Sequence, residues 1–195
     1  MVASEQVLHC QHSLHTLKTL LLASSTKWAL TPTLLSGFRM MLPRIVVFDL
    51  DACCWTPEMY QIARGSPFTY DSAKCEAISS GGERVRLLGD VRAIWGDLHS
   101  GERWQQTEVA VASRCDEPQW ARELLSKFEV LPGVSMQEVA HQGLVQIHSG
   151  NKQGHFAEIS KASGIRFSDM LFFDDDPWNI EQAGVHAYSS RHSTL

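Results

Sequence analysis

Residues 45–51 read Ile45-Val46-Val47-Phe48-Asp49-Leu50-Asp51. Four consecutive apolar residues, three of them β-branched, predict a short strand that is buried on both faces. The apolar run stops at Asp49, and a second carboxylate follows two residues later. Strands buried on both faces are typical of parallel sheets covered by helices, so this run predicts an α/β fold with charged groups where its first strand ends.

The rest of the chain beyond residue 44 alternates apolar runs with amphipathic segments. We expect further strands at 107–112, 144–148, 170–173 and 185–189, and helices at 90–99, 117–128 and 152–162. The alternation predicts a Rossmann-like parallel sheet with helices on both faces. The segment 56–82 is interrupted by Pro57, Gly65 and Pro67, and it predicts a short flap or loop after the first strand.

Length and composition fit one compact domain. The chain has 195 residues, of which 44% are hydrophobic and 20% charged, and its net charge is −5. The negative charge argues against a nucleic-acid or anionic-membrane partner, and no apolar run approaches the roughly 18 residues of a membrane-spanning helix. The five cysteines form no CxxC pair, which favours a reducing compartment such as the cytoplasm.

Residues 1–44 differ in composition from the remainder, which we expect to form a single domain at 45–195. The segment is rich in Ser and Thr and holds four basic side chains but only one acid, Glu5. This composition suits a transit peptide that would direct the protein to an organelle. A spurious extension is the alternative, because Met40 and Met41 stand just before the first strand. The sequence leaves both interpretations open.

Polar side chains follow four of the predicted strands. They are Asp49 and Asp51, Ser113 and Arg114, Lys152, and the acidic run Asp174, Asp175 and Asp176. The carboxyl ends of parallel strands meet at one edge of a sheet, where ligands bind. Crowded carboxylates repel one another unless a cation lies among them, and hard oxygen ligands select Mg²⁺. The order of these groups therefore predicts a magnesium site beside a hydroxyl and a lysine.

Four motifs, in this order, resemble those of the haloacid dehalogenase (HAD) superfamily and, more closely, of its magnesium-dependent phosphatase-1 family. They read VVFDLDACCW from Val46, VASR from Val111, GNK from Gly150 and MLFFDDDPWNI from Met170. The resemblance extends over about residues 42–190. It implies a HAD-type fold and a two-step phosphoryl transfer through an aspartyl-phosphate, which would make the protein a phosphomonoester hydrolase.

The resemblance implies a role for each motif residue. Asp49 matches the nucleophile, and Asp51 matches the general acid that protonates the leaving group and then activates water. Ser113 matches the hydroxyl that binds a phosphoryl oxygen, with Arg114 beside it to bind the same group or the rest of the substrate. Lys152 matches the catalytic lysine that stabilises the charge of the transferred group.

The metal ligands follow from the same resemblance. Asp174 and Asp175 match the metal-binding acids, and Asp49 with the backbone carbonyl of Asp51 completes the expected protein ligands of Mg²⁺. Asp176 is expected to lie outside the ligand set. The chain departs from the superfamily at Cys53, where threonine is common, and a thiol hydrogen-bonds more weakly than a hydroxyl.

The sequence argues against three other classes of protein. A cysteine-based phosphatase needs an arginine that ends the loop after its cysteine, and 53–57 contains none. A receiver-type signalling domain carries its acidic pair on the first strand and its phosphorylated aspartate on a later one, the reverse of the order here. A non-catalytic phosphoprotein-binding domain would lack Asp49 or Asp51, whereas both are present.

The spacing of the motifs bounds the size of the substrate. The 62 positions from Asp51 to Ser113 and the 39 from Ser113 to Lys152 leave no room for a folded cap domain. An open site favours a phosphorylated protein side chain, such as phosphotyrosine, or a phosphosugar. Five flap residues could stack on such a ring or pack within the flap instead: Trp55, Met59, Tyr60, Phe68 and Tyr70. The sequence does not predict the oligomeric state.

Overall fold

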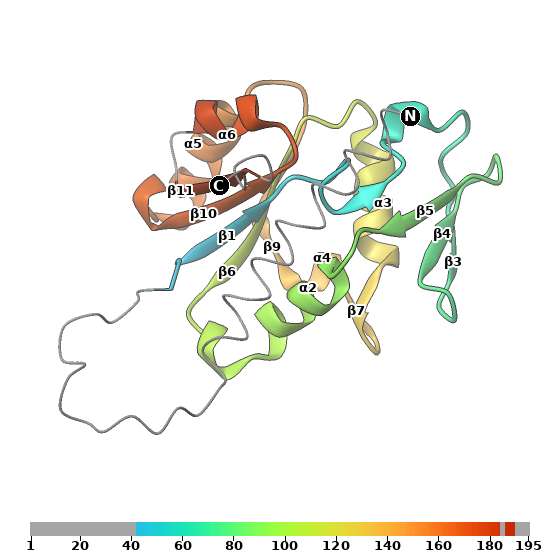
Figure 1. Ribbon diagram of the computed structural model, residues 1–195, viewed down its shortest axis with the longest axis horizontal. Coiled ribbons are helices and arrows are strands. Elements are labelled where there is room, and N and C mark those ends of the chain that lie inside the picture. Colours follow the sequence, from blue (N-terminus) through green and yellow to red (C-terminus); the bar gives the residue numbers. More distant parts are fainter. Residues whose placement is uncertain (1–41, 184–185, 190–195) are drawn as a thin grey trace, which may run out of the picture.

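The computed structural model describes residues 42–183 and the strand His186–Ser189. The leader segment, apart from its last three residues, lies outside the described residues. Five strands of the described chain form a parallel sheet in the order β11-β10-β1-β6-β9 (Figure 1). Their bounds are β1 Ile45–Phe48, β6 Glu108–Ser113, β9 Ala140–Ile147, β10 Met170–Asp174 and β11 His186–Ser189. The predicted Rossmann-like sheet is confirmed.

Helices cover both faces of this sheet (Figure 1). The helices are α2 Val91–Ser100, α3 Pro118–Lys127, α4 Met136–Val139, α5 Lys152–Ser163 and α6 Pro177–Ala183, with short 3-10 turns η1 Met59–Gln61, η2 Glu102–Trp104 and η3 Phe167–Asp169. Alternate residues of β1 explain the two layers. Val47 packs in one buried cluster with Phe156 of α5, and Phe48 packs in the other with Trp95 of α2. No described helix has the length and apolar character that crossing a bilayer demands.

Local sequence signals explain where the helices begin and end. Pro118 occupies the first turn of α3, where a missing N–H is tolerated. Asn151 caps α5, because its side chain accepts a hydrogen bond of 2.8 Å from the Gly154 N–H. The helix ends at Gly164, whose φ of 69° lies in the left-handed region. The start of α5 at Lys152 is therefore fixed by its cap.

The segment predicted as an irregular flap is instead an antiparallel sheet. Its strands are β2 Trp55–Thr56, β3 Thr69–Asp71, β4 Glu76–Ile78 and β5 Arg84–Leu87, in the order β2-β5-β4-β3. We call residues 55–87 the flap sheet. It is tied to α3, since the Phe68 N–H donates to Glu123 at 2.7 Å and Gly65 lies flat against the Trp120 ring. The sequence prediction missed these strands because each has only two to four residues.

Between β6 and β9 the chain forms more than the predicted helix and strand. A hairpin of β7 Glu129–Leu131 and β8 Val134–Ser135 follows α3, and α4 leads into β9. β9 begins four residues before the predicted start at residue 144. All residues between Ser113 and Lys152 are described, and these elements account for them without a separate cap domain.

Candidate active site

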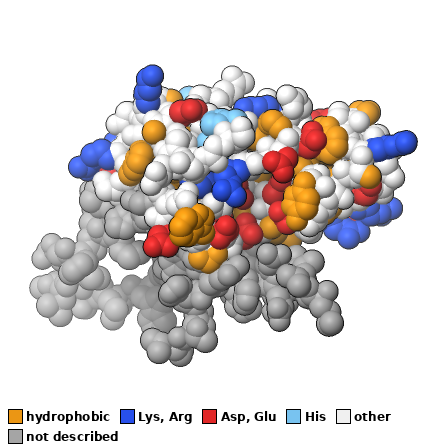
Figure 2. Space-filling model, turned by 90° about the horizontal axis from the view of Figure 1, so that it is seen from above, with side chains coloured by type: hydrophobic (Ala, Val, Ile, Leu, Met, Phe, Trp, Pro, Cys, Tyr) orange, Lys and Arg blue, Asp and Glu red, His pale blue; other side chains and the backbone are white. Residues whose placement is uncertain are grey.

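The residues predicted to do chemistry lie around one pocket at the carboxyl ends of the parallel strands. Its volume is about 940 Å³. Seen from above, acidic, basic and histidine side chains lie close together on this face, with hydrophobic side chains among them (Figure 2). The lining residues are Asp49, Asp51, Glu58, Tyr60, Gln61, Ser113, Arg114, Cys115, Asp116, Ser149, Gly150, Lys152, Asp175, Asp176 and Asn179. All the predicted site residues except Asp174 are among them, and Asp174 lies directly behind this wall.

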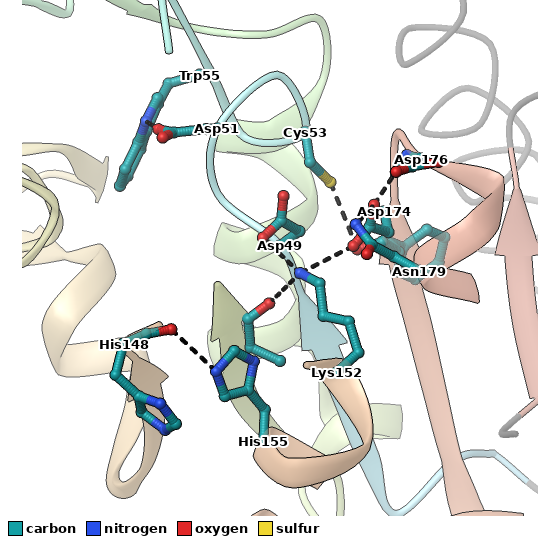
Figure 3. Close-up of polar contacts among 12 residues, drawn as sticks. Asp49, Asp51, Cys53, Trp55, His148, Lys152, His155, Asp174, Asp176 and Asn179 are labelled. Carbon is teal, nitrogen blue, oxygen red and sulfur yellow. Dashed lines mark hydrogen bonds and ion pairs between the residues drawn. The ribbon is translucent and has the colours of Figure 1, made fainter. Parts of the chain in front are cut away.

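Lys152 is the centre of a buried charge cluster (Figure 3). Its Nζ lies 2.8 Å from Asp49 Oδ1 and 2.9 Å from Asp174 Oδ2, and it donates to the Ala112 carbonyl at 2.6 Å. The lysine side chain is only 1% exposed. Burial alone would lower its pKa, but the two carboxylates raise the pKa on balance, so the lysine stays charged. A single cation therefore links the end of β1 to the end of β10.

Asp51 is held apart from this cluster by its own donors. The Trp55 indole Nε1 donates to Asp51 Oδ1 at 2.7 Å, and the Met59 N–H donates to Oδ2 at 3.2 Å. Burial raises the pKa of Asp51 to about 6, although both hydrogen bonds oppose that shift. A carboxyl group with this pKa can both give and accept a proton near neutral pH, as a general acid and base must.

Among the described residues, Asp49, Asp174 and Asp175 form a group of side chains that could bind a metal ion. One carboxylate oxygen from each lies within 4.8 Å of the others. Burial, followed by the charges of Asp49 and Asp174, raises the pKa of Asp175 to about 8, and burial with Asp49 also raises the pKa of Asp174. Burial and the repulsion among crowded carboxylates both favour the protonated forms, and a divalent cation would offset that repulsion. The oxygen donors fit a hard cation.

Asp176 and Asn179 support the metal-site acids. Asp174 Oδ1 accepts from the Asp176 N–H at 2.8 Å and from Asn179 Nδ2 at 3.0 Å. The Asp176 carboxylate itself accepts from the Trp178 N–H at 3.0 Å, so it caps α6. This geometry agrees with the expectation that Asp176 lies outside the ligand set.

Ser113 and Arg114 line the pocket at the end of β6, on the other side of β1 from β10. Ser113 ends β6 and is buried, whereas Arg114 is exposed at the pocket mouth. Cys115 follows them and lies beside Asp51, and burial together with that carboxylate raises the pKa of its thiol. The thiol is therefore protonated, which is a further reason against a cysteine-based phosphatase at this site.

The loop after β1 keeps a hydrogen bond at the position where threonine is common. Cys53 Sγ donates to the Phe173 carbonyl of β10 at 3.6 Å (Figure 3). A thiol reaches farther than a hydroxyl but donates more weakly. The bond nevertheless joins the loop that carries Asp51 to the neighbouring strand.

Of the two open interpretations of the five flap residues, packing within the protein holds for four. Trp55, Met59 and Phe68 are buried in the core, and Tyr70 packs edge-on against the Phe128 ring at 5.9 Å between centroids. Only Tyr60, which is 64% exposed, lines the pocket. The pairing of the flap strands turns the other aromatic residues inward, and a sequence pattern cannot show that pairing.

Several lining residues were missed by the sequence prediction. Cys115 and Asp116 directly follow the VASR motif, and Asn179 lies within the MLFFDDDPWNI motif, so their neighbours in sequence could have pointed to them. Glu58 and Gln61 belong to the flap segment, where no motif marked them.

Comparison with known proteins identifies the family. The family model described as Acid Phosphatase matches residues 41–191. A HAD-like hydrolase superfamily protein of Schizosaccharomyces pombe is 30% identical over 148 residues, which cover 73% of this chain and 83% of that protein. Human magnesium-dependent phosphatase 1 is 32% identical over 139 residues, which cover 71% of each chain.

One solved structure is similar to part of this chain. It is the N-terminal part of a Bacteroides fragilis protein that contains a phosphatase domain, in complex with Mg. The match has a TM-score of 0.49 and 17% identity, over 75% of this chain and 36% of that chain. The family match and the two relatives confirm the resemblance predicted from the motifs: the chain belongs to the acid phosphatase family of HAD-like hydrolases, and it is a phosphatase of the HAD type.

Proposed function

We propose that this protein is a Mg²⁺-dependent phosphomonoester hydrolase that works through a phosphorylated Asp49. One observation carries the proposal: Asp49, Asp51 and Lys152 line the same open pocket, with the acidic pair Asp174 and Asp175 beside it. A phosphoprotein-binding module has no use for two carboxylates beside a bound phosphate, since they would repel it.

The proposed reaction has two steps. An oxygen of Asp49 attacks phosphorus, the bond from phosphorus to the leaving oxygen breaks, and Asp51 gives that oxygen its proton. In the second step Asp51 takes a proton from water, whose oxygen attacks the same phosphorus and releases Asp49 and inorganic phosphate. The raised pKa of Asp51 supports this double role.

Three side chains are suited to hold the transferred phosphoryl group. Lys152 brings a permanent positive charge to within 2.8 Å of the attacking carboxylate. Ser113 offers a hydroxyl and Arg114 a guanidinium at the end of β6. Together they would stabilise the charge that spreads over the phosphoryl oxygens.

Mg²⁺ is the cation that we propose for the acidic group. Among the described residues, six carboxylates and two cationic side chains, Arg114 and Lys152, line the pocket, so a phosphate dianion needs further positive charge there. The carboxylates of Asp49, Asp174 and Asp175, with the backbone carbonyl of Asp51, would hold the ion. When bound, it would neutralise phosphate charge and act as a Lewis acid. The names of two similar proteins, a magnesium-dependent phosphatase and a Mg complex, agree with this choice.

The proposed substrate is a phosphate on a protein, such as phosphotyrosine, or on a sugar. The wall beyond the charged groups comes from the flap, through Glu58, Tyr60 and Gln61. These side chains offer a ring face and hydrogen-bonding groups to the leaving group. The pocket mouth would admit a side chain that projects from a protein.

The leader and the location are separate proposals. We propose that residues 45–195 form the phosphatase domain, and that 1–44 either direct the protein to an organelle or are a spurious extension. Fusion of residues 1–44 to a fluorescent reporter tests this, because import of the reporter supports a transit peptide. A diffuse cytoplasmic signal supports the extension.

Hydrolysis of p-nitrophenyl phosphate by the full chain tests the proposed function. We expect turnover with Mg²⁺ and none after chelation with EDTA, restored when Mg²⁺ is added back. Rapid acid quench should trap phosphate on the protein during turnover. Full activity in EDTA would contradict the metal assignment, and phosphate binding without turnover would favour the non-catalytic alternative.

A further inference from the structure

His155 is a buried histidine that the proposed reaction does not use. It lies on α5, one turn after Lys152, and its side chain is 0% exposed. A histidine that is shielded from solvent beside a catalytic pocket needs a physical reason, because a polar ring is costly to bury without a partner. Its one described hydrogen-bond partner is the backbone of the loop before α5.

That partner is the carbonyl of His148, which lies 3.2 Å from His155 Nε2 (Figure 3). A carbonyl oxygen only accepts, so Nε2 must carry the ring proton and donate it. The other nitrogen, Nδ1, is buried with no hydrogen-bond partner among the described residues. An unprotonated Nδ1 is the less costly state there, and burial accordingly lowers the pKa of His155 to about 4. The ring is therefore a neutral, permanent donor at neutral pH.

The loop that receives this bond forms part of the pocket wall. We call residues 148–151 the β9–α5 loop. Its Ser149 and Gly150 line the pocket, and its Asn151 caps the helix that presents Lys152. Gly150 has a φ of +147°, which a residue with a side chain rarely adopts. The loop is exposed at Ser149 and Gly150. Its shape depends on a contact of 2.9 Å between His148 Nδ1 and the Ser149 carbonyl, and on the bonds at its two ends.

Both backbone groups of His148 are fixed. Its N–H donates to the Ser113 carbonyl at 3.2 Å, and its carbonyl accepts from His155. The first bond joins the loop to the strand end that carries the expected phosphate-binding hydroxyl. The second joins it to α5. The His148 ring packs edge-on against His155, 4.3 Å between centroids, and its Nε2 lies 3.4 Å from Glu158 Oε2.

We propose that His155 is a positioning residue, whose Nε2–H holds the β9–α5 loop in the shape that lets Ser149 and Gly150 contact the phosphate of the substrate. This inference rests on the proposed function, since it assigns the loop a part in phosphate binding. Lys152 has three contacts of its own, with Asp49, Asp174 and the Ala112 carbonyl. Loss of the His155 bond should therefore disturb the loop rather than the lysine.

The test separates the hydrogen bond from the packing of the ring. His155→Phe keeps an aromatic ring but removes the hydrogen-bond donor. His155→Gln loses the ring and part of its packing contacts but keeps an N–H donor near the position of Nε2. His155→Met matches glutamine in length without donating, so the Gln and Met pair repeats the comparison if the phenylalanine variant does not fold. Phe156→Leu, in the apolar contacts of the same helix, is the control for general loosening of α5.

We expect the Phe and Met variants to raise KM and the inhibition constant of inorganic phosphate by about tenfold, the effect of losing one partly buried hydrogen bond. kcat should change by less than about twofold, because the lysine and both acids stay in place. Amide hydrogen exchange over residues 148–151 should accelerate in the same two variants. His155→Gln and Phe156→Leu should resemble the natural chain in all these measurements.

Two results would overturn the inference. One is that the His155→Phe variant has the same phosphate affinity and the same amide hydrogen-exchange rates as the natural chain. The other is that His155→Gln loses as much phosphate affinity as His155→Met, which would show that the His155 ring acts through packing alone. If the natural chain hydrolyses no phosphomonoester, the proposed function fails. Hydrogen exchange and calorimetric binding of inorganic phosphate would still decide whether His155 holds the loop.

Discussion

Two charge clusters in this molecule are mirror images in composition and differ in the exposure of their outer groups. At the edge of the parallel sheet, one cation, Lys152, lies between the carboxylates of Asp49 and Asp174. In the flap sheet, one carboxylate, Glu76, lies between Arg84 and Arg86, at 2.8 and 2.6 Å. The central side chains are both largely buried, Lys152 at 1% and Glu76 at 12% exposed. Their partners differ, because Asp49 and Asp174 are 10% and 0% exposed, whereas Arg84 and Arg86 are 46% and 57% exposed.

Burial of the outer charged groups, more than the number of contacts, distinguishes the reactive cluster from the structural one. In the buried cluster each charge depends on the others, because no water replaces a lost partner. In the exposed cluster water and salt compensate for much of a lost contact. Five predictions test this difference.

Asp49→Asn should abolish turnover of every substrate, because it removes the attacking carboxylate. The measurement is hydrolysis of p-nitrophenyl phosphate and of an alkyl phosphate with Mg²⁺ present. Asp71→Asn, in an exposed ion pair of the flap sheet with Lys74, is the matched control and should keep full activity. Residual turnover by Asp49→Asn above background would remove Asp49 from the role of nucleophile.

Asp51→Asn should lower activity by roughly 10²- to 10⁴-fold, the range for loss of a general acid and base. The loss should be greater for an alkyl phosphate, whose leaving oxygen needs a proton, than for p-nitrophenyl phosphate. With the latter substrate, acid quench should recover phosphate bound to the variant protein. No bound phosphate, together with equal losses on both substrates, would show that the roles of the two aspartates are misassigned.

Lys152→Met should lower the free energy of unfolding by about 3 kcal/mol in metal-free protein, because two buried carboxylates lose their cation. Urea denaturation near neutral pH measures the change. Lys161→Met, at the exposed end of the same helix, should change it by less than about 0.5 kcal/mol. Equal effects at the two lysines would contradict the importance of burial.

Mg²⁺ should raise the melting temperature more at about pH 9 than at about pH 5. The raised pKa values of Asp175, about 8, and of Asp174 mean that the folded protein binds protons more tightly than the unfolded chain. The stability from those protons is present at low pH and is lost as the pH rises through 8. Mg²⁺ competes with the protons, so its effect should grow over the same range. A shift that is independent of pH would place the ion elsewhere.

Glu76→Gln in the flap sheet should have the smallest effect, a minor fraction of the loss caused by Lys152→Met. Both arginines remain hydrated after the change, and hydrogen bonds from Arg86 and Arg84, which lower the pKa of Glu76, are partly kept by an amide oxygen. Urea denaturation at low and high salt checks this. High salt should shrink the difference from the natural chain, and a large loss that is insensitive to salt would break the comparison.

The parallel sheet was the most predictable region. The first strand was expected at 45–48 and is found at Ile45–Phe48, because a continuous apolar run between polar residues leaves little choice of boundaries. Strand β9 starts earlier than expected, since its first residues lie at the sheet edge and His141 and Gln142 are exposed. Exposed polar residues on an edge strand do not give the apolar pattern by which a strand is predicted from sequence.

The site was predictable where it depends on strand ends, and unpredictable where it depends on the flap or on backbone contacts. Asp49, Lys152 and Asp175 lie where the order of strands implied. Glu58 lines the pocket from the flap sheet, which is tied to α3 by contacts such as the bond from the Phe68 N–H to Glu123, and such contacts leave no period in the sequence. His155 bonds to a carbonyl, and no side-chain motif encodes that partner.

The position of β1 has a consequence for the order of folding. β1 lies in the middle of the sheet and pairs with β10, so that Ile45 stands beside Met170. The carboxylates of Asp49 and Asp174 are therefore separated by nearly the whole domain along the chain. During synthesis on a ribosome, β1 and Asp49 are produced first, and β1 cannot pair with β10 until the segment that contains β10 has emerged. Because contacts between residues so distant along the chain slow folding, we expect the catalytic centre to form late, when β10 pairs with β1.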